Sequence, residues 1–145
     1  MEQFTGSVPT NWNTNDAQRI SRVTAQGRVH TGSSAVNLTN GGELWQDIRI
    51  TGGCYFDFSF FARGEGAQVA IEATVTFMNA QGDSQSGLTI SIHSQNLTND
   101  NREFAYYRGI TGQAPAGATM ARVRFAVTAE GGQSADLDDV SFSTD

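Results

Sequence analysis

The sequence contains no lysine, and its nine basic residues are all arginines. Against 15 acidic residues they leave a formal net charge of −6 and a pI of about 4.7. Binding to a phosphate backbone depends on clustered basic side chains, which an acidic chain of this kind does not supply. The composition therefore predicts no nucleic-acid partner and favours neutral molecules or cations.

Cysteine, long apolar runs and targeting signals are also scarce. Cys54 is the single cysteine, so no internal disulfide can form. No apolar stretch approaches the roughly 20 residues of a membrane-spanning helix, which predicts no membrane insertion. The start of the chain, Met1 to Phe4, lacks the charged and apolar regions of a signal peptide. Either the protein is not secreted in this form or Met1 is not the native start.

Few residues are suited to enzyme chemistry. His30 and His93 are the two histidines, and no strained nucleophile motif surrounds any serine, so nucleophilic catalysis is not indicated. Two histidines and one cysteine far apart in sequence also make zinc binding a poor fit. A glycosidase needs two carboxylates that flank one bond, and the spacing here pairs none. The carboxylates in question are Asp57, Glu65, Glu72 and Glu130. We therefore expect no enzymatic activity.

What the sequence does contain is apolar–polar alternation. It is clearest at residues 69–77, where every second side chain is apolar, a pattern typical of a strand with one face in the core. The predicted strands cover residues 19–24, 28–30, 36–38, 43–50, 55–61, 69–77, 88–92, 104–110, 121–127 and 135–142. The predicted core positions are Ile71, Val75, Phe77, Phe56, Phe58, Phe60, Val123 and Phe125.

No segment shows a sustained helical period of apolar residues. Short strands separated by glycine and asparagine turns predict an all-β antiparallel sandwich or barrel. With 145 residues, we expect one domain spanning 1–145.

The last predicted strand carries an acidic residue toward the core. Asp138 has the same strand parity as Val140 and Phe142, and a buried carboxylate is costly unless its charge is compensated. Compensation can come from a bound cation or from an arginine, for which Arg19 and Arg22 are candidates. We interpret this segment as a closing strand beside the turn at 30–36.

Taken in order, several segments resemble a known pattern. They are Phe4 to Trp12, residues 30–36, Trp45 to Ile48, residues 55–64, residues 114–123 and Asp138 to Phe142. This succession resembles the galactose-binding-like jelly roll of carbohydrate-binding modules, in particular families four, nine and twenty-two. Similar domains also precede collagen-like repeats on bacterial surfaces. The resemblance covers nearly the whole chain and implies a jelly-roll β-sandwich.

The resemblance also implies a structural calcium ion near the chain ends. Its ligands in such modules are carbonyls of the turn matching Thr31 and Ser33, the aspartate matching Asp138, and a glutamate after an N-terminal phenylalanine. Here Thr5 follows Phe4, and a neutral hydroxyl is a weaker calcium ligand than a carboxylate. Either Glu2 or a carbonyl such as that of Gln3 takes its place, or the site is weak or missing.

Sugar binding asks for aromatic rings that stack on pyranose faces and planar polar side chains that read hydroxyls. The predicted ligand-binding residues are Trp12, Trp45, Asp57, Phe61, Arg63, Glu72, Tyr107, Arg122 and Arg124. Each has a structural alternative: cross-strand ion pairs for the charged residues, a core anchor for Trp12, and cover by the N-terminal arm or a loop for Phe61.

The resemblance implies non-catalytic binding of a polysaccharide or oligosaccharide by a module appended to a larger extracellular or cell-surface protein. The alternative is a structural or adhesion domain at a cell, spore or virion-fibre surface, which contacts proteins or forms homo-oligomers. An open groove lined by rings would favour sugar, and a flat apolar patch would favour a protein partner.

Overall fold

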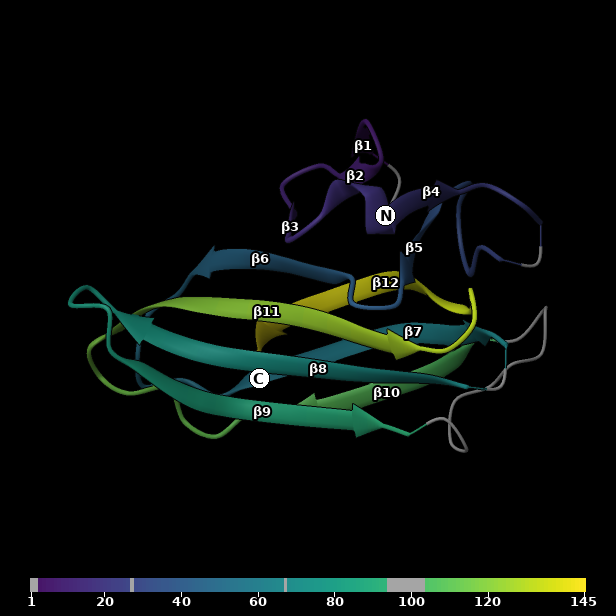
Figure 1. Ribbon diagram of the computed structural model, residues 1–145. Helices are drawn as coiled ribbons and strands as arrows, with labels where there is room; N and C mark the ends of the chain where they lie inside the picture. Colours follow the sequence, from purple (N-terminus) through teal and green to yellow (C-terminus); the bar gives the residue numbers. More distant parts are fainter. Residues whose placement is uncertain (1–2, 27, 67, 94–103) are drawn as a thin grey trace.

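The computed structural model describes residues 3–26, 28–66, 68–93 and 104–145. Two five-stranded antiparallel sheets face each other, and a two-stranded ribbon lies in the N-terminal arm (Figure 1). The predicted all-β jelly-roll sandwich is therefore confirmed. None of the helices in the described ranges is long and apolar enough to cross a membrane.

The two sheets are named here after their central strands. The β12 sheet has the order β10-β7-β12-β5-β4. Its strands are β4 (Ile20–Val23), β5 (Ala35–Thr39), β7 (Phe56–Glu65), β10 (Ala105–Ile110) and β12 (Ser134–Thr144). The β11 sheet has the order β3-β6-β11-β8-β9. Its strands are β3 (Asn13–Thr14), β6 (Glu43–Arg49), β8 (Val69–Asn79), β9 (Ser84–Ile92) and β11 (Ala118–Ala129). The N-terminal arm holds β1 (Phe4–Thr5), β2 (Val8–Pro9) and the 3-10 helix η1 (Ala17–Arg19).

The core lies between the two sheets and is built by alternate side chains. All eight predicted core positions are at most 5% exposed. Phenylalanine rings cross the interface, and the centroids of Phe60 and Phe125 are 5.0 Å apart in an edge-to-face contact. Burying each such ring contributes about 1.5–3 kcal/mol to folding.

One predicted strand is absent, and several strands, β7 among them, are longer than expected. Residues Arg28 and His30 do not form a strand but belong to a bent segment, residues 28–34, that crosses β12; we call it the covering segment. In β7 the chain does not break at Arg63 and continues to Glu65, because Arg63 and Gly64 pair with Asp136 and Ala135 of β12.

The closing strand contains a β-bulge between Asp138 and Ser141, and Asp139 adopts a positive φ of 49°. Leu137 pairs with the buried Ala62, whereas Asp138 pairs with Phe61 on the outer face. The extra residue of a bulge shifts the facing of everything after it. The prediction that Asp138 shares a face with Val140 and Phe142 is therefore wrong, since Phe142 pairs with the inward-facing Phe58.

The sandwich opens along one side. In the β11 sheet, β3 pairs with β6 at Leu44 and Trp45 alone. In the β12 sheet, β5 pairs with β12 over Ser134–Leu137 alone. Within the described residues, the rest of β6 and the rest of β12 are therefore paired with a neighbouring strand on one side and unpaired on the other. The space between these two strands is accessible from outside.

Candidate functional site

The outer face of the β11 sheet brings together four of the predicted ligand-binding residues. Trp45, Arg124 and Thr74 lie opposite one another in neighbouring strands, and Arg122 occupies the next outward position of β11. Glu72 lies opposite Ala126, one outward position further along β11 in the other direction. We call these residues and the side chains between them the β11 face.

The charged side chains of the β11 face are paired across strands. Arg122 binds Asp47 with Nε–Oδ1 and Nη2–Oδ2 distances of 2.7 and 3.0 Å. Arg124 donates to Glu43 with an Nε–Oε1 distance of 2.8 Å. The hydrogen bond to Asp47 raises the pKa of Arg122 above its ordinary value. The structural alternative of cross-strand ion pairs is thus confirmed for both arginines, and their guanidinium planes are fixed.

Trp45 forms the aromatic part of this face. Its ring is partly exposed, and the guanidinium carbon of Arg122 lies 5.7 Å from the ring centroid, in a cation–π contact. Small side chains occupy the neighbouring positions of β8 and β11. A hollow of about 260 Å³ opens beside Glu72; its lining includes Ala70, Ser91, His93, Ala126 and Thr128. The β11 face therefore has a ring at β6, fixed planar groups beside it and a depression beyond.

Asp57 and Phe61 lie on the opposite side of the molecule, on the outer face of the β12 sheet. Asp57 accepts two hydrogen bonds from the Arg108 Nε at 2.9 and 3.1 Å, which raise the pKa of Arg108. His30 of the covering segment stacks on Phe61 with ring centroids 3.7 Å apart. The structural alternative for Phe61, cover by a loop, is confirmed.

Arg63 does not lie on a wet face, and that prediction is wrong. Its side chain points outward from the β12 sheet but is fully buried, where it pairs with Asp136 and, at 2.5 Å, with Glu65. Arg28 of the covering segment binds the same Asp136 with an Nη2–Oδ1 distance of 2.9 Å. A loop over the sheet has turned an outward position into a buried one.

Tyr107 is not an exposed ring, and that prediction is also wrong. It pairs with Phe60 and faces inward, with ring centroids 5.4 Å apart. Its hydroxyl is buried without a hydrogen-bond partner in the described part of the chain, and burial raises its pKa. The neighbouring Tyr106 is the outward ring and is 54% exposed. Arg108 and Tyr106 lie on the same side of β10, because they are two residues apart. The charged Arg108 was therefore the sequence signal that this side faces outward and that Tyr107 faces inward.

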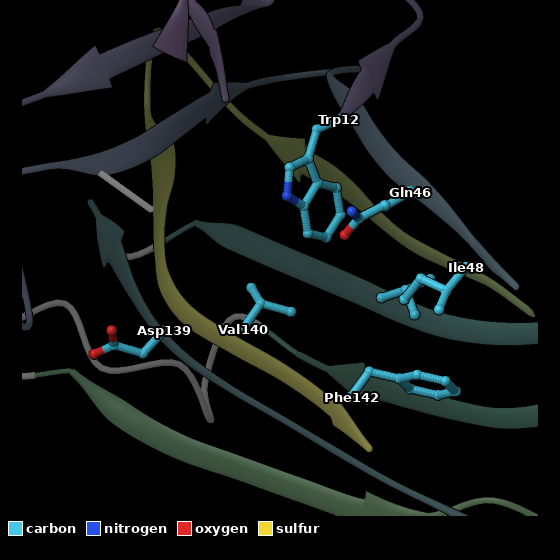
Figure 2. A pocket seen from close by; sticks show the side chains of 7 residues that line it. Trp12, Gln46, Ile48, Asp139, Val140 and Phe142 are labelled. Carbon is cyan, nitrogen blue, oxygen red and sulfur yellow. The ribbon is translucent and has the colours of Figure 1, made fainter. Parts of the chain in front are cut away.

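Trp12 borders the open side of the sandwich (Figure 2). Its indole lies over the core 6.0 Å from the Phe125 ring centroid, which confirms the role of core anchor. The same indole also borders a cavity of about 440 Å³. The other lining residues are Gln46, Ile48, Val123, Asp139, Val140 and Phe142. Gln46 was not predicted as a site residue. A sequence signal for it exists, because it is a polar side chain at an inward position between the apolar Leu44 and Ile48.

Asp138 is fully buried beneath the covering segment. Its Oδ2 accepts from the backbone N–H groups of His30 and Thr31 at 3.0 and 3.2 Å, and its Oδ1 accepts from that of Asp139 at 2.9 Å. The two predicted arginine partners have other contacts: Arg19 pairs with Asp16 at 3.3 Å, and Arg22 donates to the Ser34 hydroxyl at 2.8 Å. Backbone amides therefore contribute to compensating this carboxylate.

The corner around Asp138 is where the resemblance places a calcium ion. Next to Asp138, Thr31 donates its hydroxyl to the Asp139 carboxylate at 2.6 Å, and oxygen ligands are those that calcium prefers. Within the described residues, no three acidic, histidine or cysteine side chains group as metal ligands. The Gln3 carbonyl accepts from the Thr10 N–H at 2.8 Å, and Glu2 lies outside the described residues. Asp138 has the carboxylate chemistry that calcium binds, and in this structure its two oxygens accept from backbone N–H groups.

Neither a family model nor a curated protein matches this sequence. Solved structures do match. The module TmCBM61 in complex with β-1,4-galactotriose has a TM-score of 0.71 and 19% identity over 96% of this chain and 92% of that one. The enzymatically active domain of tailspike protein 4 from bacteriophage CBA120 has a TM-score of 0.70 and 18% identity, over 94% of this chain and 20% of that one.

The CBM22-1–GH10 modules of Clostridium thermocellum xylanase 10B, complexed with xylohexaose, give a TM-score of 0.67 and 12% identity, covering 93% of this chain and 26% of that one. At such identities the likeness shows the fold. The resemblance to carbohydrate-binding modules of the jelly-roll type is confirmed at that level.

Proposed function

We propose that this protein is a non-catalytic carbohydrate-binding module that holds an oligosaccharide or polysaccharide on the β11 face. The observation that carries the proposal is the convergence of Trp45, Arg122, Arg124 and Glu72 on one outer surface beside a hollow. A ring that stacks on a pyranose, with planar polar groups at its side, is the chemistry that sugar recognition requires.

The pairing of charges on this face favours a neutral ligand. Arg122 and Arg124 are each held by a carboxylate, so the face presents hydrogen-bonding groups without an uncompensated positive charge. The same pairing supports a non-catalytic role, because Asp47 and Glu43 hold guanidinium groups and are not poised as a proton donor and a base. The structural neighbours include a module in complex with β-1,4-galactotriose and the joined CBM22-1–GH10 modules complexed with xylohexaose, which supports binding of a β-linked oligosaccharide.

The proposal extends to the setting of the domain. The xylanase match occupies 26% of that chain, an arrangement in which a module of this fold is joined to an enzyme. We infer that this domain likewise serves a larger extracellular or cell-surface protein, where polysaccharides are available as ligands.

A glycan-array screen followed by calorimetry tests the proposal. Trp45→Ala should weaken binding of a glycan selected by the screen about tenfold or more, since losing one stacked ring removes roughly 0.5–1.5 kcal/mol beyond its buried area. Arg124→Ala should act in the same direction. Asp57→Ala, on the opposite face, is the matched control and should leave affinity unchanged. Equal affinity for the parent and both β11-face variants would exclude this face.

A rival function has its own observation. Tyr106 and Ile110 are 54% and 45% exposed on β10, an edge strand of the β12 sheet. Exposed apolar side chains on an edge strand are typical of surfaces that contact another chain. Light scattering of the purified domain checks homo-oligomerisation: a monomer at high concentration would count against it, and an oligomer dispersed by Tyr106→Glu would support it.

We further propose that a structural calcium ion binds at Asp138 and the turn carbonyls of Thr31 and Ser33. The ion would tie the covering segment to the closing strand. The amide donors already around Asp138 hold the carboxylate in place for it.

A further inference from the structure

The open side of the sandwich holds a groove that the β11 face does not use. The cavity beside Trp12 adjoins a second hollow of about 390 Å³, and the two share Ile48 and Phe142. Residues at the outer end of this second hollow include Arg49, Thr51, Ser143 and Thr144. The two hollows form one groove between β6 and the C-terminal half of β12.

The Trp12 end of the groove contains two hydrogen-bonding groups, the Gln46 amide and the Trp12 indole N–H. Gln46 pairs with the buried Val123 in register, so its amide points inward, and Figure 2 shows it beside the indole. In the part of the chain that the structure describes, neither the Gln46 amide nor the Trp12 indole nitrogen has a hydrogen-bond partner in the protein. Both side chains are half-buried, and neither polar group is a buried unsatisfied atom, so both are open to water and to a ligand that displaces it.

The floor of the groove is apolar. Ile48, Val140 and Phe142 lie below the indole and the amide (Figure 2). The Asp139 carboxylate lines the rim but is engaged by Thr31 and His30 of the covering segment. The ligand must therefore present a planar donor and acceptor to Gln46 and an apolar group to the floor.

We propose that this groove binds a sugar residue that carries an acetamido group, as in an N-acetylhexosamine. The acetamido C=O and N–H match the donor and acceptor of Gln46, and its methyl group fits the apolar floor. A hydroxyl in the place of the acetamido group would lose its water against Ile48 and Val140 without a new partner, which costs affinity. The indole ring and its N–H are left for the pyranose itself.

This site goes beyond the proposed function and rests on different residues from the β11 face. Both sites together would let one domain hold two glycan segments. Such bivalency raises retention on a mixed polysaccharide without any new contact.

Titration of the whole domain with two disaccharides tests the inference. Di-N-acetylchitobiose should bind at least tenfold more tightly than cellobiose, which carries hydroxyls in place of the acetamido groups. In ¹⁵N spectra, chitobiose should shift the Gln46 side-chain amide and the Trp12 indole signals. Gln46→Leu should reduce chitobiose affinity tenfold or more, and Gln46→Glu, which keeps the size but loses the amide donors, should do the same.

Two controls separate the outcomes. Asp57→Ala, on the outer face of the β12 sheet, should leave chitobiose binding unchanged, and melting curves of the Gln46 variants check that they fold. Equal binding of the two disaccharides, or no shift of either signal at millimolar chitobiose, would overturn the groove site. If another glycan then still binds in a Trp45-dependent manner, the β11 face stands alone. Chitobiose binding lost in Gln46→Leu, with no glycan sensitive to Trp45→Ala, would support the groove and remove the β11 face.

Discussion

The outer faces of the two sheets have the same sequence pattern but differ in their exposure to solvent. On the β11 face, Arg122 and Arg124 point outward and remain partly exposed, each held by one acidic partner. On the outer face of the β12 sheet, which we call the β12 face, Arg63 and Asp136 also point outward and are fully buried, because the covering segment lies over them. Strand parity therefore indicates which side of a sheet a residue is on. It does not report whether that side meets water.

The largest expected effect comes from breaking the buried pair. Asp136→Ala removes one carboxylate partner of the buried Arg63, which keeps Glu65, and takes away an acceptor of Arg28 and Asn37. Loss of one member of a buried ion pair costs about 3–5 kcal/mol. Urea denaturation should therefore show a loss of this size in the free energy of unfolding.

The matched control lies on the β11 face. Asp47→Ala breaks the Arg122 pair, whose side chains are 40% and 29% exposed, and should cost less than about 1 kcal/mol. Equal losses for the two aspartate variants would contradict the view that the covering segment is what separates the faces.

Calcium removal should also affect the β12 face alone, because the proposed calcium site ties down the covering segment. A ligand that binds the folded state alone stabilises it by about 2.7 kcal/mol at a hundredfold excess over its dissociation constant. Chelator should therefore lower the melting temperature of calcium-loaded protein, and Asp138→Ala should remove that sensitivity. Melting curves identical with and without chelator would exclude the ion.

Much of the fold could be predicted from the sequence. Alternation located the long strands, and every predicted core phenylalanine is buried, because period-two patterning follows directly from strand geometry. Two features could not be predicted this way. The bulge at Asp139 reverses the facing of the closing strand, and the covering segment buries Arg63.

Part of the candidate site could also be predicted from the period-two alternation of strands. Trp45, Glu72, Arg122 and Arg124 share a face because they lie on neighbouring strands with correct parity. Asp57 and Phe61 have equally correct parity, but β7 belongs to the other sheet. Parity alone carries no information on which sheet a strand joins, since that depends on long-range pairing.

A smaller effect is expected at the inner edge of the β12 sheet. The Tyr107 hydroxyl is buried without a partner in the described residues, and an unsatisfied group of this kind costs about 1–3 kcal/mol. Tyr107→Phe removes the hydroxyl and keeps the ring stacked on Phe60, so we expect a gain of roughly 1 kcal/mol in denaturation experiments. Tyr106→Phe, on the exposed neighbour, is the control and should be neutral. A destabilised Tyr107→Phe would show that the hydroxyl has a partner that stabilises it.

The smallest effect concerns the contact between the covering segment and the bulge. Burial opposes ionisation of Asp139, but hydrogen bonds from Thr31 and His30 outweigh it and hold its pKa below the ordinary value of 3.8. A carboxyl whose folded pKa is lowered adds stability that is fully present above its unfolded pKa and is lost as the pH falls through the folded one. Because Asp139 and His30 are about 30% exposed, the contribution should stay below about 1 kcal/mol.

Asp139→Asn isolates that contribution. Asparagine tolerates the positive φ of this bulge, so the backbone should be kept while the charge is lost. The variant should lose slightly less stability than the parent between about pH 5 and pH 3 and should be the less stable of the two at pH 7. Stability curves measured by urea denaturation at each pH give the difference directly. Parallel curves for the two proteins would mean that the covering segment is held without this carboxylate, and that the buried pair beneath it suffices to keep the β12 face closed.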